Sequence, residues 1–89
     1  MVEERDIYIE IIRSSSKEHQ IRMAVEEMGE LIVAINHYRR GKCSLEDVVG
    51  EMVDVDITLN QLKIIYDVED LFGVMKEKEL REKIDNLIV

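Results

Sequence analysis

Apolar residues recur at intervals of three and four positions along most of this 89-residue chain, and that spacing is the period of the α-helix. The longest stripe consists of Ile21, Ala24, Val25, Met28, Leu31, Ile32 and Ile35. The chain has no proline, and three tyrosines and one phenylalanine are a thin supply of aromatic residues for a strand-rich core. The pattern therefore predicts an all-α fold of four or five helices.

Capping residues indicate where the central helices begin and end. Ser15 stands three residues before Glu18, as in a reciprocal capping box, and predicts the start of the second helix. Gly41 follows two arginines and predicts that this helix ends in a left-handed residue. Ser44 predicts the start of a third helix, which we expect to end near Asp67.

The two ends of the chain carry shorter apolar patterns. A short first helix is predicted by Ile7, Tyr8, Ile11 and Ile12, ahead of three serines. Beyond residue 67, Leu71 and Met75 share one stripe, whereas Leu80 and Ile84 fall on another. This change of stripe predicts a kink or a break between Met75 and Leu80.

The length of the chain limits what it can bury. We expect residues 1–89 to form a single domain. A chain of this size buries only about 60 to 65% of the surface that its unfolded form exposes, so a lone monomer would be marginally stable. We therefore expect self-association, as a homodimer or a dimer of dimers.

Charge and cysteine content narrow the class of protein. Acidic residues outnumber basic ones by 20 to 12, which gives a net charge of −8 and disfavours binding to nucleic acid or to an anionic membrane. No segment approaches the roughly 18 apolar residues of a membrane span, and the first residues lack the layout of a signal peptide. With a single cysteine, Cys43, the composition favours a soluble protein of the reducing cytoplasm.

Four acidic residues of the second and third predicted helices lack basic neighbours. Glu27 and Glu30 are three positions apart, as are Glu51 and Asp54, and no lysine or arginine occurs from residue 43 to residue 62. Each pair lies beside the apolar stripe of its helix at nearly the same angle, so the two pairs are predicted to face each other. Four carboxylates between packed helices repel one another unless some are protonated or a cation joins them.

A divalent metal is the simplest partner for such a cluster. Ligation by oxygen alone favours Mg²⁺, Mn²⁺ or Ca²⁺, and Mg²⁺ characteristically binds one or two carboxylates together with waters and substrate phosphates. The four acids are therefore predicted to act on a phosphate ester or anhydride, with Glu27 or Glu30 as the general base.

The two acidic motifs resemble those of a known family. Glu27 and Glu30 in an ExxE pattern, followed after 20 residues by Glu51 and Asp54 in an ExxD pattern, are similar to the motifs of the MazG-like all-α nucleoside triphosphate pyrophosphohydrolases. This superfamily also includes dimeric dUTPases and dCTP pyrophosphatases. The resemblance, which covers about residues 18–87, implies a MazG-like bundle in which these four acids bind Mg²⁺. It also implies that the protein cleaves a nucleoside triphosphate to a monophosphate and pyrophosphate. The cellular role implied by this reaction is the removal of unwanted nucleotides from the nucleotide pool.

Relatives often carry a Lys-x-x-Arg-Leu pattern near the carboxyl end, whose basic residues approach the phosphates. Here Lys83 matches the lysine, but Asn86 stands in place of the arginine, and Gly50 replaces a further glutamate that many relatives have before ExxD. Lys83 and Lys76 are the expected sources of positive charge on the phosphates, and Asn60 is a candidate contact to the base.

Other assignments of these residues remain open or are excluded. Lys83 can instead pair with Glu79, and His37 and Cys43 are expected to be an ordinary surface residue and an ordinary loop thiol. Neither histidine follows a glutamate at the spacing of a di-iron bundle, and the segment from Asp54 lacks the glycine and the final glutamate of an EF-hand loop. The main alternative function is a noncatalytic helical oligomer, with a regulatory or scaffolding role.

Overall fold

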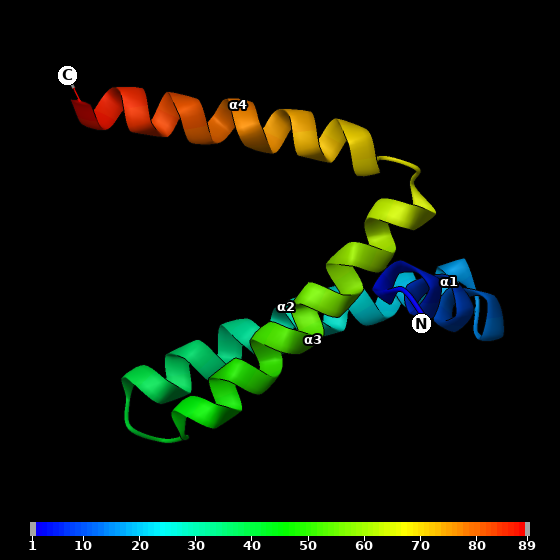
Figure 1. Cartoon of the computed structure of the whole chain (residues 1–89). Helices are drawn as coiled ribbons and strands as arrows, with labels where there is room; N and C mark the ends of the chain where they lie inside the picture. Colours follow the sequence, from blue (N-terminus) through cyan, green and yellow to red (C-terminus); the bar gives the residue numbers. More distant parts are fainter. Residues whose placement is uncertain (1, 89) are drawn as a thin grey trace.

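A computed structural model describes residues 2–88 of the chain, the last of them by its backbone alone. Four helices follow one another: α1 (Glu4–Ser14), α2 (Lys17–Arg39), α3 (Leu45–Ile65) and α4 (Glu69–Ile88). Helices α2 and α3 form an antiparallel hairpin, α1 lies at the open end of this hairpin, and α4 leaves from the end of α3 (Figure 1). The described residues contain no strand, which confirms the all-α fold. None of these helices has the length and hydropathy that a membrane span requires.

The hairpin turn follows the predicted caps. Gly41 has a φ of 70°, and the N–H of Lys42 donates to the carbonyl of His37 at 2.8 Å, which together complete a Schellman motif at the end of α2. Ser44 then caps α3 in a reciprocal capping box: its hydroxyl accepts from the Asp47 N–H at 3.1 Å, and the Asp47 carboxylate accepts from the Ser44 N–H at 3.0 Å. These two caps fix the reversal that places α3 against α2.

The start of α2 differs from the prediction by one residue. Ser16, not Ser15, is the N-cap, and its hydroxyl accepts from the N–H of His19 at 3.0 Å. Ser15 still belongs to the end of α1, because its own N–H donates to the carbonyl of Ile11 at 3.1 Å. The Ser15 hydroxyl does not cap α2 but accepts a hydrogen bond from the side-chain amide of the buried Gln20 at 2.8 Å.

The predicted kink in the last helix is wrong, because α4 is continuous from Glu69 to Ile88. At 100° per residue, Leu71 and Leu80 lie about half a turn apart on a straight helix, so the change of stripe reflects two opposite faces and not a bend. Two ion pairs between residues four positions apart lie at the end of this interval: Arg81 Nη2 is 2.9 Å from Glu77 Oε1, and Lys83 Nζ is 3.5 Å from Glu79 Oε1.

Asp67 gives a prediction about stability. It ends α3 in a Schellman motif with a φ of 54°, a conformation that glycine adopts without the steric cost of a Cβ. We expect Asp67→Gly to stabilise the protein by about 0.5 to 1 kcal/mol, an increase of about 2 to 8 °C in Tm by calorimetry. Gly41→Ala should lower Tm for the same reason, and an unchanged or lower Tm in Asp67→Gly would contradict the argument.

The chain buries few apolar side chains by itself. Among the described residues, the buried apolar side chains are Tyr8, Ala24 and Val48, and the other buried ones are Gln20, Thr58 and Gln61. Helix α4 packs on α3 alone, and its first turn is tied to α1 by a bidentate ion pair between Arg5 and Glu69, with contacts of 2.8 and 2.9 Å. Large apolar side chains on α2, α3 and α4 remain exposed.

Candidate metal centre

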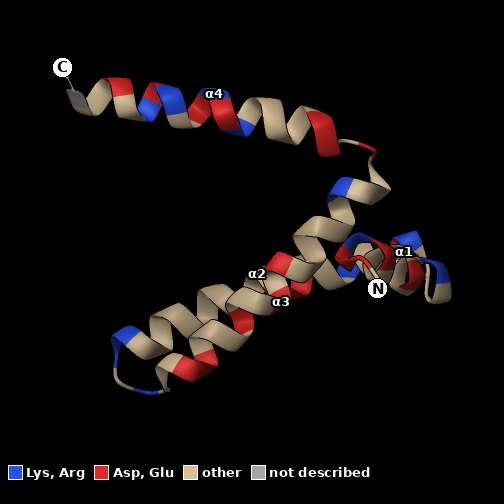
Figure 2. Ribbon diagram, viewed as in Figure 1, with Lys and Arg blue, Asp and Glu red and all other residues tan. Residues whose placement is uncertain are grey.

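The hairpin brings the predicted acids together. Carboxylate oxygens of Glu27 on α2 and of Glu51 and Asp54 on α3 all lie within 4.8 Å of one another. Glu30 is next to this group, because its carboxylate contributes to raising the pKa of both Glu27 and Glu51. Acidic residues gather midway along the α2–α3 pair, and the closed end of the hairpin carries basic residues together with the acids at the start of α3 (Figure 2).

The helical period and the antiparallel packing account for this convergence. Ala24 is buried on α2 and Val48 is buried on α3, the two helices that pack against each other. Glu27 stands three positions after Ala24, and Glu51 stands three positions after Val48. At 100° per residue, each acid therefore lies about 60° around its helix from that buried residue, in the same rotational sense on both helices. In an antiparallel hairpin, positions displaced in the same sense lie on the same face of the pair.

Two of the acids are held where ionisation is unfavourable. The Oε2 atoms of Glu27 and Glu51 are buried and have no hydrogen-bond partner. Burial is the largest cause that raises the pKa of each carboxyl above its ordinary value near 4.5, and the negative charge of Glu30 is the next. In the part of the chain that the structure describes, the ion pairs of lysine and arginine involve other acids than these four.

The cluster fits a hard divalent cation. Two oxygens on opposite sides of a Mg²⁺ ion are about 4.2 Å apart, since each bond is about 2.1 Å long. The carboxylate oxygens of Glu27, Glu51 and Asp54 all lie within 4.8 Å of one another, so small side-chain adjustments would let them converge on one such ion. A cation here would also give the two orphaned carboxylate oxygens the partner that they lack.

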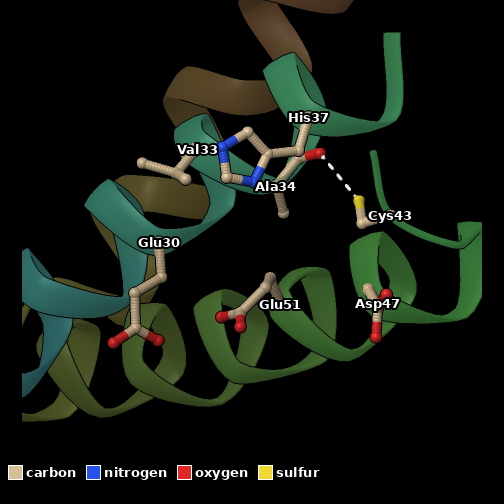
Figure 3. A pocket seen from close by; sticks show the side chains of 7 residues that line it. All are labelled: Glu30, Val33, Ala34, His37, Cys43, Asp47 and Glu51. Carbon is tan, nitrogen blue, oxygen red and sulfur yellow. Dashed lines mark hydrogen bonds between the residues drawn. The ribbon is translucent and has the colours of Figure 1, made fainter. Parts of the chain in front are cut away.

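An open cavity of about 350 Å³ adjoins the acids and was not predicted from the sequence. It is lined by Glu30, Val33, Ala34, His37, Cys43, Asp47 and Glu51 (Figure 3). The Cys43 thiol donates to the carbonyl of Ala34 at 3.4 Å, and bonds from Ser44 hold the pKa of Asp47 below its ordinary value. The spacing of residues 30, 33, 34 and 37 along one helix face was the signal that could have identified α2 as a wall of this cavity.

The three predicted substrate contacts lie elsewhere in the chain. Lys83 and Lys76 are exposed on α4, where Lys83 pairs with Glu79 and Lys76 borders a second cavity beside Phe72. Asn60 on α3 donates to the backbone carbonyl of Asp56 at 2.8 Å. None of the three is among the described residues that line the cavity beside the acids, so their contact with a substrate stays a prediction.

No family model, curated protein or solved structure matches this chain. The resemblance to the MazG-like enzymes therefore depends on the sequence patterns alone, chiefly the ExxE and ExxD motifs. The case for a metal centre depends in addition on the geometry of Glu27, Glu51 and Asp54 and on the orphaned oxygens among them.

Proposed function

We propose that this protein is a Mg²⁺-dependent nucleoside triphosphate pyrophosphohydrolase with a MazG-like bundle, which hydrolyses nucleotides to monophosphates and pyrophosphate. The observation that carries the proposal is the convergence of Glu27, Glu51 and Asp54, in which a buried oxygen of Glu27 and another of Glu51 have no hydrogen-bond partner among the described residues. These acids lack cationic partners among the described residues and lie beside an open cavity. Such a site is suited to a Mg²⁺ ion that binds the carboxylates on one side and the phosphates of a substrate on the other.

The acids divide into two roles. Glu27, Glu51 and Asp54 would hold Mg²⁺, with Mn²⁺ as a substitute, because their oxygens are already close together. A bound Mg²⁺ neutralises phosphate charge and orients the reacting groups. Glu30 lies outside the close group of three and borders the cavity, so its carboxylate is available to take the proton from an attacking water. The water oxygen then bonds to phosphorus as the bond between the α and β phosphates breaks, and pyrophosphate leaves.

The described residues that line the cavity include no lysine or arginine, so positive charge on the phosphates has to come from elsewhere. Lys83 and Lys76 remain the proposed donors of this charge, and Asn60 a proposed contact to the base. Helix α4 turns back from the end of α3 but packs on α3 alone (Figure 1), and its lysines are not among the described residues that line the cavity, so the two lysines would reach the acids of another copy of the chain and not their own.

The reaction is tested by measuring pyrophosphate release from a panel of standard and modified nucleoside triphosphates, with Mg²⁺ and with EDTA. We expect release from one or a few nucleotides in Mg²⁺ and none in EDTA, because unneutralised acids would repel the triphosphate. Release that persists in EDTA would contradict the metal centre.

If no nucleotide of the panel releases pyrophosphate, the result would favour a noncatalytic helical oligomer. The exposed apolar side chains of α2, α3 and α4 are the observation that supports this second function, because such surfaces mark sites of association. An oligomer of that kind would keep its assembly in EDTA and would tolerate alanine at all four acids.

A further inference from the structure

A further cavity lies where α1 meets the open end of the hairpin (Figure 1). It has a volume of about 460 Å³ and is lined by Ile9, Ile12, Arg13, Lys17 and Ile64. None of these residues lines the cavity of about 350 Å³ beside the acids. The further cavity is therefore separate from the candidate metal centre and from the site proposed for the triphosphate.

Three helices contribute the walls of this cavity. Helix α1 packs on both α2 and α3, and Tyr8 is its buried residue. Ile9 and Ile12 lie about 100° and 40° from Tyr8 around the helix, on the same side, at 100° per residue. Both isoleucines thus border the packed face of α1, where they are half-buried, and Ile64 in the last turn of α3 is half-buried as well.

The lining of the cavity combines aliphatic side chains with two cations. Arg13 lies in the last turn of α1, and Lys17 is the first residue of α2, so that only residues 14–16 separate them in the sequence. Both cations are exposed, whereas the three isoleucines are half-buried. The cavity therefore has an aliphatic interior and a positively charged rim.

The described chain does little to neutralise these two cations. Arg13 Nη1 lies 3.9 Å from Glu10 Oε2, a long contact between two side chains that are 74% and 72% exposed, and such pairs are weak. Lys17 takes part in none of the ion pairs among the described residues. It also begins α2, and the first turn of a helix carries partial positive charge. In a chain with a net charge of −8, the rim is a local site for an anion.

We propose that this cavity binds a small amphiphilic anion, an organic acid with an apolar body. The body contacts Ile9, Ile12 and Ile64, and the carboxylate contacts Arg13 and Lys17. Small-molecule sites are typically apolar cavities of about 300 to 1,000 Å³ in which a few polar groups orient the ligand. The arginine can bind a carboxylate through two parallel hydrogen bonds, while burial of the apolar body against the isoleucines adds affinity. Binding requires neither Mg²⁺ nor a nucleotide, so its failure would leave the proposed enzymatic function unaffected.

The ligand class is tested by titration calorimetry in EDTA with octanoate, an aliphatic acid, and 2-naphthoate, an aromatic one. We expect at least one of these acids to bind at one site per chain, and the tighter of the two identifies the kind of apolar body. Acetate has the head without the body, and 1-octanol has the body without the charge. Each should bind roughly tenfold more weakly or worse, because it lacks one of the two contributions.

The place of binding is tested by the methyl NMR signals of isoleucine during the same titration. We expect the acid to shift the signals of Ile9, Ile12 and Ile64. The signals of Ile32 and Ile84 should stay in place, although these side chains are 62% and 52% exposed. An acid that merely coats exposed apolar surface would instead shift the exposed isoleucines at least as strongly.

The charged rim is tested by the double variant Arg13→Gln, Lys17→Gln, which should weaken binding by roughly tenfold or more. The matched control is Arg22→Gln, Lys42→Gln, which removes the same charge from exposed positions outside the cavity lining and should keep the affinity within about twofold. The proposal would be overturned by any of four results: no binding of either acid, equal binding of acetate or 1-octanol, equal shifts at Ile32, or equal affinity in the two double variants.

Discussion

Replacing Glu30 by alanine is expected to lower Mg²⁺-dependent pyrophosphate release by about a hundredfold to ten-thousandfold, the usual contribution of a general base. Glu30 borders the open cavity and lies outside the close group formed by Glu27, Glu51 and Asp54. The variant should therefore lose turnover while it still binds Mg²⁺. The measurement is kcat and KM for the preferred nucleotide, with isothermal titration of Mg²⁺ alongside.

Two further variants distinguish the base from the metal ligands. Glu51→Gln should lose both turnover and Mg²⁺ binding, because Glu51 contributes a carboxylate oxygen to the close group. Glu26→Ala removes an exposed acid from the same helix, one position from Glu27 and outside both the close group and the cavity lining, and should change neither property. Equal rates in Glu30→Ala and Glu26→Ala would contradict the role of Glu30. Loss of Mg²⁺ binding in Glu30→Ala would instead make it a ligand.

The parts of the fold that depend on local chemistry could be predicted from the sequence. Gly41 and Ser44 are caps whose effect is confined to neighbouring residues, and both are confirmed. The convergence of the acids also follows from local rules, because a short turn forces α2 and α3 to be antiparallel neighbours and the helical period then sets which residues face each other. The N-cap of α2 was misplaced because Ser15 and Ser16 are both good caps, and only the competing bond from Ser15 to Ile11 distinguishes them.

What could not be predicted depends on which surfaces meet. The two stripes of α4 were interpreted as a kink because a single helix usually buries one face, yet α4 is straight and packs on α3 alone. The cavity beside the acids needs the loop at Cys43 to fold back on Ala34, a contact with no sequence pattern of its own.

Saturation with Mg²⁺ is expected to raise the Tm of the wild type by about 10 to 20 °C. A ligand at a hundred times its Kd stabilises the folded state by about 2.7 kcal/mol, and each kcal/mol shifts the Tm of a domain of this size by about 4 to 8 °C. Glu27→Gln should abolish this response, because it removes one of three close carboxylates. Glu26→Gln is the control that should keep it. Calorimetry with Mg²⁺ and with EDTA provides the measurement.

The same cluster gives the metal-free protein an unusual dependence on pH. The pKa values of Glu27 and Glu51 are raised in the folded chain, so the folded state binds more protons than the unfolded state above pH 4.5. Their stabilising contribution is complete below pH 4.5 and is lost as the pH rises through the raised pKa values. In EDTA, the Tm should therefore rise as the pH is lowered from neutral toward 4.5, and Glu27→Gln should weaken this rise.

Asp47 and Glu69 act in the opposite direction at lower pH. Bonds from Ser44 lower the pKa of Asp47, and the Arg5 guanidinium lowers the pKa of Glu69. Each carboxylate therefore stabilises the folded chain at a pH above its ordinary pKa, which is 3.8 for Asp47 and 4.5 for Glu69. This contribution is lost as the pH falls through the lowered pKa values. The Tm in EDTA should consequently pass through a maximum near the lower end of the mildly acidic range. Saturating Mg²⁺ should move that maximum toward neutral pH, because only the ionised carboxylates of the cluster bind the ion. A wild-type maximum at the same pH in EDTA and in Mg²⁺ would show that the raised pKa values of Glu27 and Glu51 belong to a buried acidic pair and not to a metal centre.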